Sequence, residues 1–393
     1  MQTARDAVVA ASIRRVMPPL SDPGFWRDRA VFVTGHTGFT GAWLALWLRS
    51  LGARVTGLSD GVPTSPSLFD LARLAEDVTD VRADVRDHAA VLGALADAQP
   101  EVVVHLAAQP FVRRSFADPR GTYETNVMGT VNVLEAVRAT PSVSAVVCVT
   151  TDKCYDNDPA RPRRPFVETD PMGGHDPYSS SKGCAELVVD AYRRSFFDGP
   201  DGPNLATARA GNVVGGGDWG EDRLVPDIMR GALAGRPIPV RNPEAVRPWQ
   251  HVLNPLSGYL RLAEALHGGP QSQGAWNFGP ALDDARPVRW IADRVSELWP
   301  GELRWELDPG PHPHEAHYLA LDCAKAREQL GWEPVWDLDE ALAGTVAWYR
   351  ALRDGEDMRA VTLGQIAAFA AAGARSENGW SSRESGVASS WRR

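Results

Sequence analysis

A glycine-rich turn between two apolar segments is the feature that most restricts how this chain can fold. Residues 30–34 (AVFVT) have the β-branched character of a buried strand, and residues 43–48 (WLALWL) are typical of a helix. Gly35, Gly38 and Gly41 lie between them, and such glycines permit a tight turn, approach of a pyrophosphate and close helix–strand packing. The pattern predicts a dinucleotide site at the helix N-terminus, with Thr37 and Phe39 beside the glycines; a plain turn is the alternative.

Strand and helix patterns alternate through the first half of the chain. Apolar runs recur at 54–58, 101–106 and 145–150, and helical patterns cover 121–139 and 178–197. Such alternation predicts an α/β fold, a Rossmann-type doubly wound parallel sheet with a smaller interleaved α/β substrate-binding domain. The expected boundaries are 25–208 for the dinucleotide-binding domain, with a return segment near 247–275; 209–246 and 276–360 for the substrate-binding domain; and 1–24 and 375–393 for peripheral or disordered tails.

Composition excludes several classes of protein. The 393 residues carry 41 Lys and Arg against 50 Asp and Glu, a formal charge of −9, which disfavours nucleic-acid binding. No stretch approaches the roughly 20 apolar residues of a membrane span, and the N-terminus lacks the features of a secretion signal. The four cysteines show no paired spacing: Cys148, Cys154, Cys184 and Cys323. We therefore expect a soluble protein of a reducing cytoplasm, without disulfides.

An acidic residue follows the second predicted strand. Asp60 lies 19 residues after Gly41, where a carboxylate would accept a hydrogen bond from the adenosine ribose and repel the 2′-phosphate of NADP. This spacing favours NAD as the cofactor, although a solvated turn aspartate is the alternative. The rest of the predicted cofactor site comes from later strand ends and helices: Asp84, Val85, Leu106, Ala107, Ala108, Gln109, Asn126 and Thr150.

Tyr178 and Lys182 open the helix predicted at 178–197. Their i, i+4 spacing puts the phenol and the ammonium group on one helix face. A nearby cation favours the phenolate, so we expect Lys182 to lower the pKa of Tyr178 and make it a base for a sugar hydroxyl. Lys182 could also hold the nicotinamide ribose. The same spacing is common in ordinary helices, and only the glycine turn upstream favours a catalytic role.

Thr151, Asp152 and Lys153 follow the predicted strand at 145–150. Ligands of parallel α/β sheets bind at the carboxyl ends of the strands. A hydroxyl, an acid and an amine in succession there supply proton donors and acceptors. A solvated strand end is the alternative.

These motifs together resemble the extended short-chain dehydrogenase/reductase family, and within it the CDP-glucose 4,6-dehydratases. The resemblance runs in order from about residue 25 to residue 360. Its specific segments are TTDKCY, GGGDW and RPWQHV, and the general ones are the glycine turn, Asn126 to Thr130 and Tyr178 to Lys182.

The resemblance implies NAD-dependent dehydration of CDP-glucose to a 4-keto-6-deoxy sugar, with hydride leaving carbon 4 and returning to carbon 6. Tyr178 would take the proton of the carbon 4 hydroxyl while Thr151 holds that oxygen. Lys153 would remove the carbon 5 proton, for which it must be neutral, and a relaying water is an alternative. Asp152 would protonate the departing carbon 6 hydroxyl.

The resemblance also implies a set of substrate-binding residues and an oligomer. Guanidinium groups suit a diphosphate. The predicted substrate residues are Asn212, Arg223, Arg241, Arg247, Gln250 and Tyr318. The helices at 121–139 and 178–197 would form the interface of a homodimer or homotetramer. His312, His314 and His317 have no acidic or cysteine partners nearby in sequence, so no metal site is expected.

Three other functions stay open at this point. A dehydratase for another nucleotide sugar would share these motifs, because the preference for cytosine depends on resemblance alone. A 4-epimerase would need no elimination residues such as Asp152 and Lys153. A non-catalytic NAD-sensing regulator would not need Tyr178 and Lys182.

Overall fold

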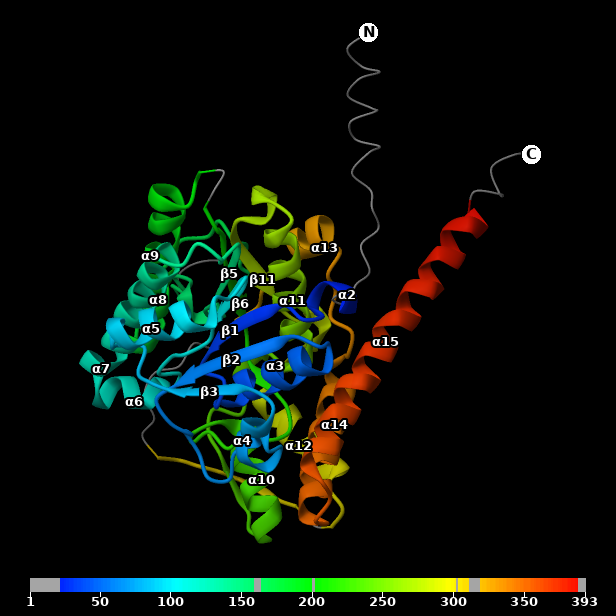
Figure 1. The fold of residues 1–393 in the computed structure, drawn as a ribbon. Helices are drawn as coiled ribbons and strands as arrows, with labels where there is room; N and C mark the ends of the chain where they lie inside the picture. The colour runs from blue at the N-terminus through cyan, green and yellow to red at the C-terminus, as the bar shows by residue number, and fades with distance from the viewer. Residues whose placement is uncertain (1–21, 159–163, 200–201, 302, 311–318, 388–393) are drawn as a thin grey trace.

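A seven-stranded parallel sheet forms the centre of the molecule, in the order β11-β6-β5-β4-β1-β2-β3 (Figure 1). The computed structural model describes residues 22–158, 164–199, 202–301, 303–310 and 319–387, with only the backbone described for 376–387. The strands are β1 (Ala30–Thr34), β2 (Arg54–Ser59), β3 (Thr79–Arg82), β4 (Val102–His105), β5 (Ala145–Val149), β6 (Asn204–Ala210) and β11 (Gly274–Phe278). The strand order reverses between β1 and β4, which confirms the predicted doubly wound sheet.

Helices cover both faces of the sheet because successive residues of the central strands, which point to opposite faces, are apolar. Val31 and Val33 of β1 pack in the core under α3 (Phe39–Ser50) and α11 (Leu253–His267). Phe32 faces the opposite layer. That layer consists of α5 (His88–Ala98), α8 (Gly129–Arg138) and α9 (Pro177–Phe196).

A smaller lobe of short paired strands and helices follows β6. Its strand pairs are β7 (Val213–Val214) with β10 (Gln250–His251), β8 (Ile238–Val240) with β13 (Trp305–Leu307), and β9 (Val246–Pro248) with β12 (Ala285–Pro287). Its helices include α10 (Leu224–Ala234), α12 (Val288–Leu298) and α14 (Leu338–Arg353). The chain returns to the main sheet through α11, which packs on β5 and β6, and through β11, which extends the sheet edge to Phe278.

Short elements complete the described chain. The helices are α2 (Pro23–Trp26), α4 (Leu68–Leu71), α6 (Val112–Ala117), α7 (Pro119–Tyr123) and α13 (Ala324–Leu330). The single turns are η1 (Leu74–Glu76), η2 (Glu124–Met128), η3 (Asp152–Cys154), η4 (Pro270–Ser272) and η5 (Leu282–Asp284). Of these turns, η2 is π-helical and joins α7 to α8, within the helical stretch predicted at 121–139.

The C-terminal helix α15 (Met358–Val387) packs against α3 and α14 and then extends away from the body (Figure 1). Its backbone is helical through Arg375, where the sequence predicted the start of an unstructured tail, as far as Val387.

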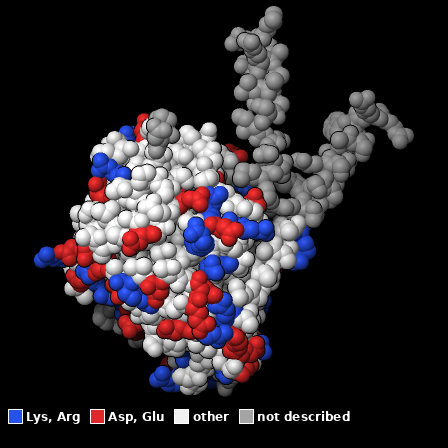
Figure 2. All heavy atoms as spheres, in the orientation of Figure 1, with Lys and Arg blue, Asp and Glu red and all other residues white. Residues whose placement is uncertain are grey.

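No described helix combines the length and the apolar character that a membrane span requires. On the face in Figure 2, acidic and basic side chains are interspersed and leave no continuous basic stripe.

Candidate active site

A cavity of about 480 Å³ opens along the carboxyl ends of the central strands. It lies where the strand order reverses, which is where doubly wound sheets bind their ligands. Most of the predicted site residues line it: Gly35, Thr37, Gly38, Phe39, Gly41, Asp60, Asp84, Val85, Leu106, Ala107, Ala108, Thr150, Thr151, Asp152, Lys153, Tyr178, Lys182, Asn212, Arg223, Arg241 and Arg247.

Three predicted residues lie behind the cavity walls. Asn126, in the π-helical turn η2, accepts a hydrogen bond of 2.8 Å from the backbone N–H of Gln109 and donates to Ser181 Oγ at 2.8 Å. Gln250 donates to the carbonyl of Phe278 at 2.8 Å. These side chains hold the strand ends and α9 in place. The predicted residue Tyr318 lies outside the described residues, as do His312, His314 and His317.

The glycine turn has no room for side chains. Gly35 has φ of +76°, in the left-handed region that favours glycine. A Cβ on Gly41 would lie 2.1 Å from the carbonyl oxygen of Gly35, so α3 can approach β1 this closely only with glycine there. The turn leaves the N-terminal N–H groups of α3 facing the cavity, and such groups bind phosphate oxygens. This cradle fits a dinucleotide pyrophosphate.

The end of β2 forms the next part of the wall. Asp60 is exposed and lines the cavity. The hydroxyl of Thr37 donates to the carbonyl of Gly61 at 2.6 Å and connects this end of β2 to the glycine turn. His36 lies buried below, 3.0 Å from Ser59 Oγ and 2.9 Å from Asp80 Oδ1, and burial lowers its pKa. An exposed carboxylate in this part of the cavity wall could accept a hydrogen bond from an adenosine ribose.

The predicted catalytic residues converge from η3 and α9. Thr151, Asp152, Tyr178 and Lys182 are all buried, with 1–7% of each residue exposed. Thr151 donates to one carboxyl oxygen of Asp152 at 3.0 Å and is hydrogen-bonded to the Tyr178 phenol. The Lys153 ammonium lies 5.8 Å from the centre of the Tyr178 ring. A hydroxyl, a carboxyl, an amine and a phenol thus face one small volume.

Burial sets the protonation of these groups. It raises the pKa of Tyr178 to about 12, whereas the side-chain hydrogen bond between Tyr178 and Thr151 lowers this pKa by less. The expected lowering of this pKa by Lys182 is therefore wrong for the protein alone. Burial also lowers the pKa of Lys182 to about 8 and raises that of Asp152. A raised carboxyl pKa suits a proton donor.

Arginines line the part of the cavity in the smaller lobe. Arg223 pairs with Asp218 at 3.1 Å, and its guanidinium lies 5.1 Å from the ring centre of Phe111. Arg247 is 5% exposed and donates to the carbonyl of Val246 at 2.9 Å. The backbone carbonyl of Asn212 accepts from the N–H of Gln250 at 3.0 Å.

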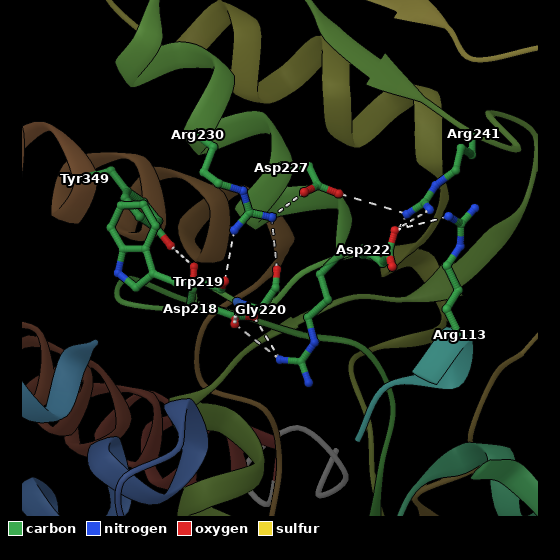
Figure 3. Close-up of polar contacts among 10 residues, drawn as sticks. Arg113, Asp218, Trp219, Gly220, Asp222, Asp227, Arg230, Arg241 and Tyr349 are labelled. Atoms are coloured by element: carbon green, nitrogen blue, oxygen red, sulfur yellow. Dashed lines mark hydrogen bonds and ion pairs between the residues drawn. The ribbon is translucent and has the colours of Figure 1, made fainter. Parts of the chain in front are cut away.

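A chain of ion pairs crosses the mouth of the cavity (Figure 3). Asp222 Oδ1 lies 2.8 Å from Arg241 Nη1 and 3.3 Å from Arg113 Nη1, so one carboxylate holds two guanidinium groups from different lobes. On its other side, Arg241 lies 4.0 Å from Asp227, which also pairs with Arg230. The positive groups at this end suit an anionic ligand such as a diphosphate.

The profile of one protein family matches most of the chain. The GDP-mannose 4,6 dehydratase family matches residues 32–345. The chain belongs to this family. The fold and the resemblance to extended short-chain dehydrogenases are thereby confirmed.

Curated relatives of this family member are 4,6-dehydratases. The CDP-glucose 4,6-dehydratase of Salmonella typhimurium strain LT2 is 49% identical over 364 residues, which cover 90% of this chain and 99% of the relative. The dTDP-glucose 4,6-dehydratase of Xanthomonas campestris pv. campestris is 31% identical over 340 residues, which cover 81% and 92%.

Solved structures show the same fold. A double mutant of the Streptomyces venezuelae dTDP-glucose 4,6-dehydratase, with NAD and DAU bound, has a TM-score of 0.69 and 25% identity, covering 84% of this chain and 99% of that one. The UDP-glucose 4-epimerase of Thermus thermophilus in complex with NAD has a TM-score of 0.71 and 26% identity, covering 81% and 98%. Both chemistries therefore occur on this architecture.

The sequence analysis missed several residues that line the site of this 4,6-dehydratase family member. Tyr259, buried on α11, lines the cavity, and its pKa is raised by burial and by the nearby Tyr178. Phe111, Arg113 and Asp218 also line it. No local spacing points to these residues, although Asp218 is the aspartate of GGGDW, one of the segments that carried the resemblance. Among the described residues, no three His, Cys, Asp or Glu side chains gather as a metal site would require.

Proposed function

We propose that this protein is an NAD-dependent CDP-glucose 4,6-dehydratase. The observation that carries the proposal is the convergence of Tyr178, Thr151, Asp152 and Lys153 on one cavity. Oxidation needs a base at one hydroxyl, and loss of water needs a second base and an acid. The 49% identity to a curated CDP-glucose 4,6-dehydratase over 90% of the chain supports the choice of substrate.

The glycine cradle and the strand ends would hold the cofactor. The N–H groups at the start of α3 would bind the pyrophosphate, and Asp60 would accept from the ribose hydroxyls. Lys182, which donates to the carbonyl of Val149 at 3.3 Å and lines the cavity, would hold the nicotinamide ribose. Bound NAD would supply the hydride acceptor for carbon 4 and, once reduced, the hydride donor for carbon 6.

The protein's own groups move the protons. Tyr178 takes the proton of the carbon 4 hydroxyl as its phenolate, a form that burial disfavours in the protein alone and that the positive charges of Lys182 and of bound NAD would favour. Thr151 holds the carbon 4 oxygen in line. The 4-ketone acidifies the carbon 5 proton, which Lys153 removes. Asp152 is buried, so its carboxyl retains a proton above the usual pKa range and can protonate the departing carbon 6 hydroxyl. The product is a 4-keto-6-deoxy sugar.

The arginines of the smaller lobe would hold the nucleoside diphosphate. Arg223 and Arg247 line the cavity beside the catalytic residues, and Arg241 lies at its mouth. Asn212 comes from the loop between them and β6. Bidentate guanidinium groups suit the two phosphates, and orientation by them would place the hexose against Tyr178.

A panel of nucleotide sugars tests the proposal. CDP-, dTDP-, GDP- and UDP-glucose are each incubated with enzyme and NAD, and the 4-keto product is measured by its absorbance in alkali. We expect CDP-glucose to have the highest kcat/KM. A higher value for another nucleotide would change the assigned substrate, and production of a 4-epimer without a 4-keto product would replace dehydration by epimerisation.

We further propose that the protein forms a homodimer through α9 and the helices beside it. Large hydrophobic side chains are exposed on these elements: Phe116, Tyr123, Met128, Leu187 and Phe196, at 37–62% exposure. Exposed apolar groups clustered in this way mark association surfaces. Light scattering after size exclusion should give a dimer for the wild type and a monomer for Leu187→Asp. A monomeric wild type would contradict this proposal.

A further inference from the structure

A buried carboxylate lies on the same face of α9 as the two predicted catalytic residues of that helix. Glu186 is one helical turn beyond Lys182 and two turns beyond Tyr178, so the three side chains share a face. Glu186 is 5% exposed, and its partner Arg209, on β6, is 4% exposed, with 2.6 Å between Arg209 Nη2 and Glu186 Oε2. Neither residue lines the cavity. Their role must therefore be indirect.

The three α9 side chains each contact a different residue at the end of β5. The contacted residues, 149–151, follow one another in the chain. The carbonyl of Val149 accepts from Lys182 at 3.3 Å. The hydroxyl of Thr150 donates to Glu186 Oε1, and Thr151 is hydrogen-bonded to Tyr178. Glu186 thus provides the middle contact between the strand end and the helix.

The Glu186 carboxylate is also fully engaged on its other side. Oε2 accepts from Thr207 Oγ1 at 2.8 Å in addition to Arg209. Arg209 in turn donates to Tyr155 Oη at 2.8 Å and to the carbonyl of Glu168 at 3.0 Å. This network extends from β6 to the residue after η3, so the charge of Glu186 is held at one position.

The surroundings of Lys182 make that charge important. The other titratable groups that interact electrostatically with its ammonium are His105 on β4, Cys148 on β5 and Cys154 in η3. Burial lowers the pKa of His105 to about 3 and raises the pKa of Cys148, so both groups are neutral at physiological pH. The pKa of Cys154 is also raised, again by burial. The formal charge that favours a protonated Lys182 therefore comes from Glu186.

We infer that Glu186, locked by Arg209, is a positioning residue that keeps Lys182 cationic and holds the strand end carrying Thr151 against α9. This inference depends on the proposed function only for its turnover readout. It assigns to the buried pair a role in the reaction beyond stability.

Glu186→Gln removes the charge and keeps the shape. Without the carboxylate, the buried ammonium loses its compensating charge, so its pKa falls below the wild-type value of about 8. Lys182 would then lose its proton at lower pH. We expect the alkaline limb of the kcat/KM profile to move down by about one pH unit or more. The same shift should appear in the pH dependence of the NAD dissociation constant, measured without any sugar.

Two variants separate charge from structure. Thr207→Val removes a hydrogen bond to Glu186 but leaves its charge, and should leave the limb where it is. Glu186→Asp keeps the charge, so its alkaline limb should stay close to that of the wild type. If Glu186→Gln is not recovered folded, the double variant E186Q/R209M also removes the guanidinium that would otherwise lack its carboxylate partner. This double variant should shift the alkaline limb in the same direction.

These experiments separate a failure of the inference about Glu186 from a failure of the proposed function. Lack of turnover of CDP-glucose by the wild type would overturn the substrate assignment but leave the NAD-binding profile as the test of Glu186. If folded E186Q has the same alkaline limb as the wild type in both the kcat/KM profile and the pH dependence of the NAD dissociation constant, the inference is overturned. Glu186 and Arg209 would then have only a structural role. A shift in Thr207→Val as large as in E186Q would overturn it as well.

Discussion

The hydroxyl of Thr151 donates a hydrogen bond of 3.0 Å to one carboxyl oxygen of Asp152, while the other carboxyl oxygen, Oδ2, is buried and has no partner within the described parts of the chain. Gly211 provides the space in front of it, because a Cβ there would lie 3.2 Å from Oδ2. Asp152 is therefore held by one oxygen, and its other oxygen is a buried, unpaired polar atom of a residue that lines the cavity.

Asp152→Asn should block elimination after the first hydride transfer. Asn can accept the Thr151 hydrogen bond but cannot supply the proton that carbon 6 hydroxide needs. We expect kcat to fall at least about 10²-fold and absorbance near 340 nm to accumulate on addition of CDP-glucose. The wild-type kcat should fall as pH rises through the raised pKa of Asp152, because the donor must be protonated. Normal turnover in the variant would exclude Asp152 as the acid.

Tyr178→Phe should remove the base for the carbon 4 hydroxyl and keep the ring. We expect the oxidation step, followed at 340 nm in a single turnover, to slow at least about 10²-fold with NAD binding retained. Tyr192→Phe is a matched control, since Tyr192 lies on the same helix, also has a pKa raised to about 12, and donates to Glu135 away from the cavity. If the oxidation step slowed equally in the two variants, the loss of rate would come from a change in α9 and not from removal of the base.

Lys153→Ala should stop exchange of the carbon 5 proton. In deuterated buffer, wild-type product should carry solvent deuterium at carbon 5, and the variant should lose that exchange at least about 10²-fold. Asp152→Asn serves as the comparison, because its base remains and exchange should fall less. Exchange at the wild-type rate in Lys153→Ala would assign the base to a water or to another side chain.

Asp60→Ala should weaken the preference for NAD over NADP. The exposed carboxylate repels a 2′-phosphate, so its removal should reduce the ratio of the two affinities by about tenfold. Isothermal titration of both cofactors measures this ratio. Glu76→Ala removes an exposed carboxylate that does not line the cavity and should leave the ratio unchanged. Equal wild-type affinities for NAD and NADP would contradict the role of Asp60.

Glu264→Gln should change how stability depends on pH. Glu264 on α11 accepts from Trp26 Nε1 at 2.6 Å and from the N–H of Asp22 at 2.9 Å, and burial raises its pKa to about 7. Between pH 4.5 and 7 the folded state holds more protons than the unfolded state, so stability falls as pH rises through this window. The loss is about 3 kcal/mol for a shift of this size. Glutamine retains both acceptor bonds without the charge.

Chemical denaturation of wild type and Glu264→Gln at pH 4.5 and pH 8 measures this effect. The free energy of unfolding of the variant relative to wild type should rise by about 3 kcal/mol between the two values. A constant difference across this range would contradict the titration of Glu264.

Features that depend on local spacing could be predicted from the sequence. The glycine turn, the strand–helix alternation and the i, i+4 spacing of Tyr178 and Lys182 each involve residues a few positions apart. Their geometry follows from the strand and helix periods alone. Asp60 could be placed for the same reason, since the second strand of such a sheet ends beside the glycine turn.

Contacts between distant segments could not be predicted in this way. Glu186 and Arg209 are 23 positions apart, and Asp222 meets Arg113 across two lobes. No period of the chain relates such residues, and only the packing of α9 on β6 or of α6 on the smaller lobe brings them together.

By itself the sequence predicted which residues would carry the chemistry and determined on which local elements they lie. The tertiary structure alone decided their protonation and their neighbours. Lys182 was expected to lower the pKa of Tyr178, but burial raises it to about 12. Asn126 was expected in the cofactor site, but it supports the wall from behind. The physical reason is that desolvation and pairing depend on which atoms surround a group in space, and that environment is assembled from residues far apart in the chain.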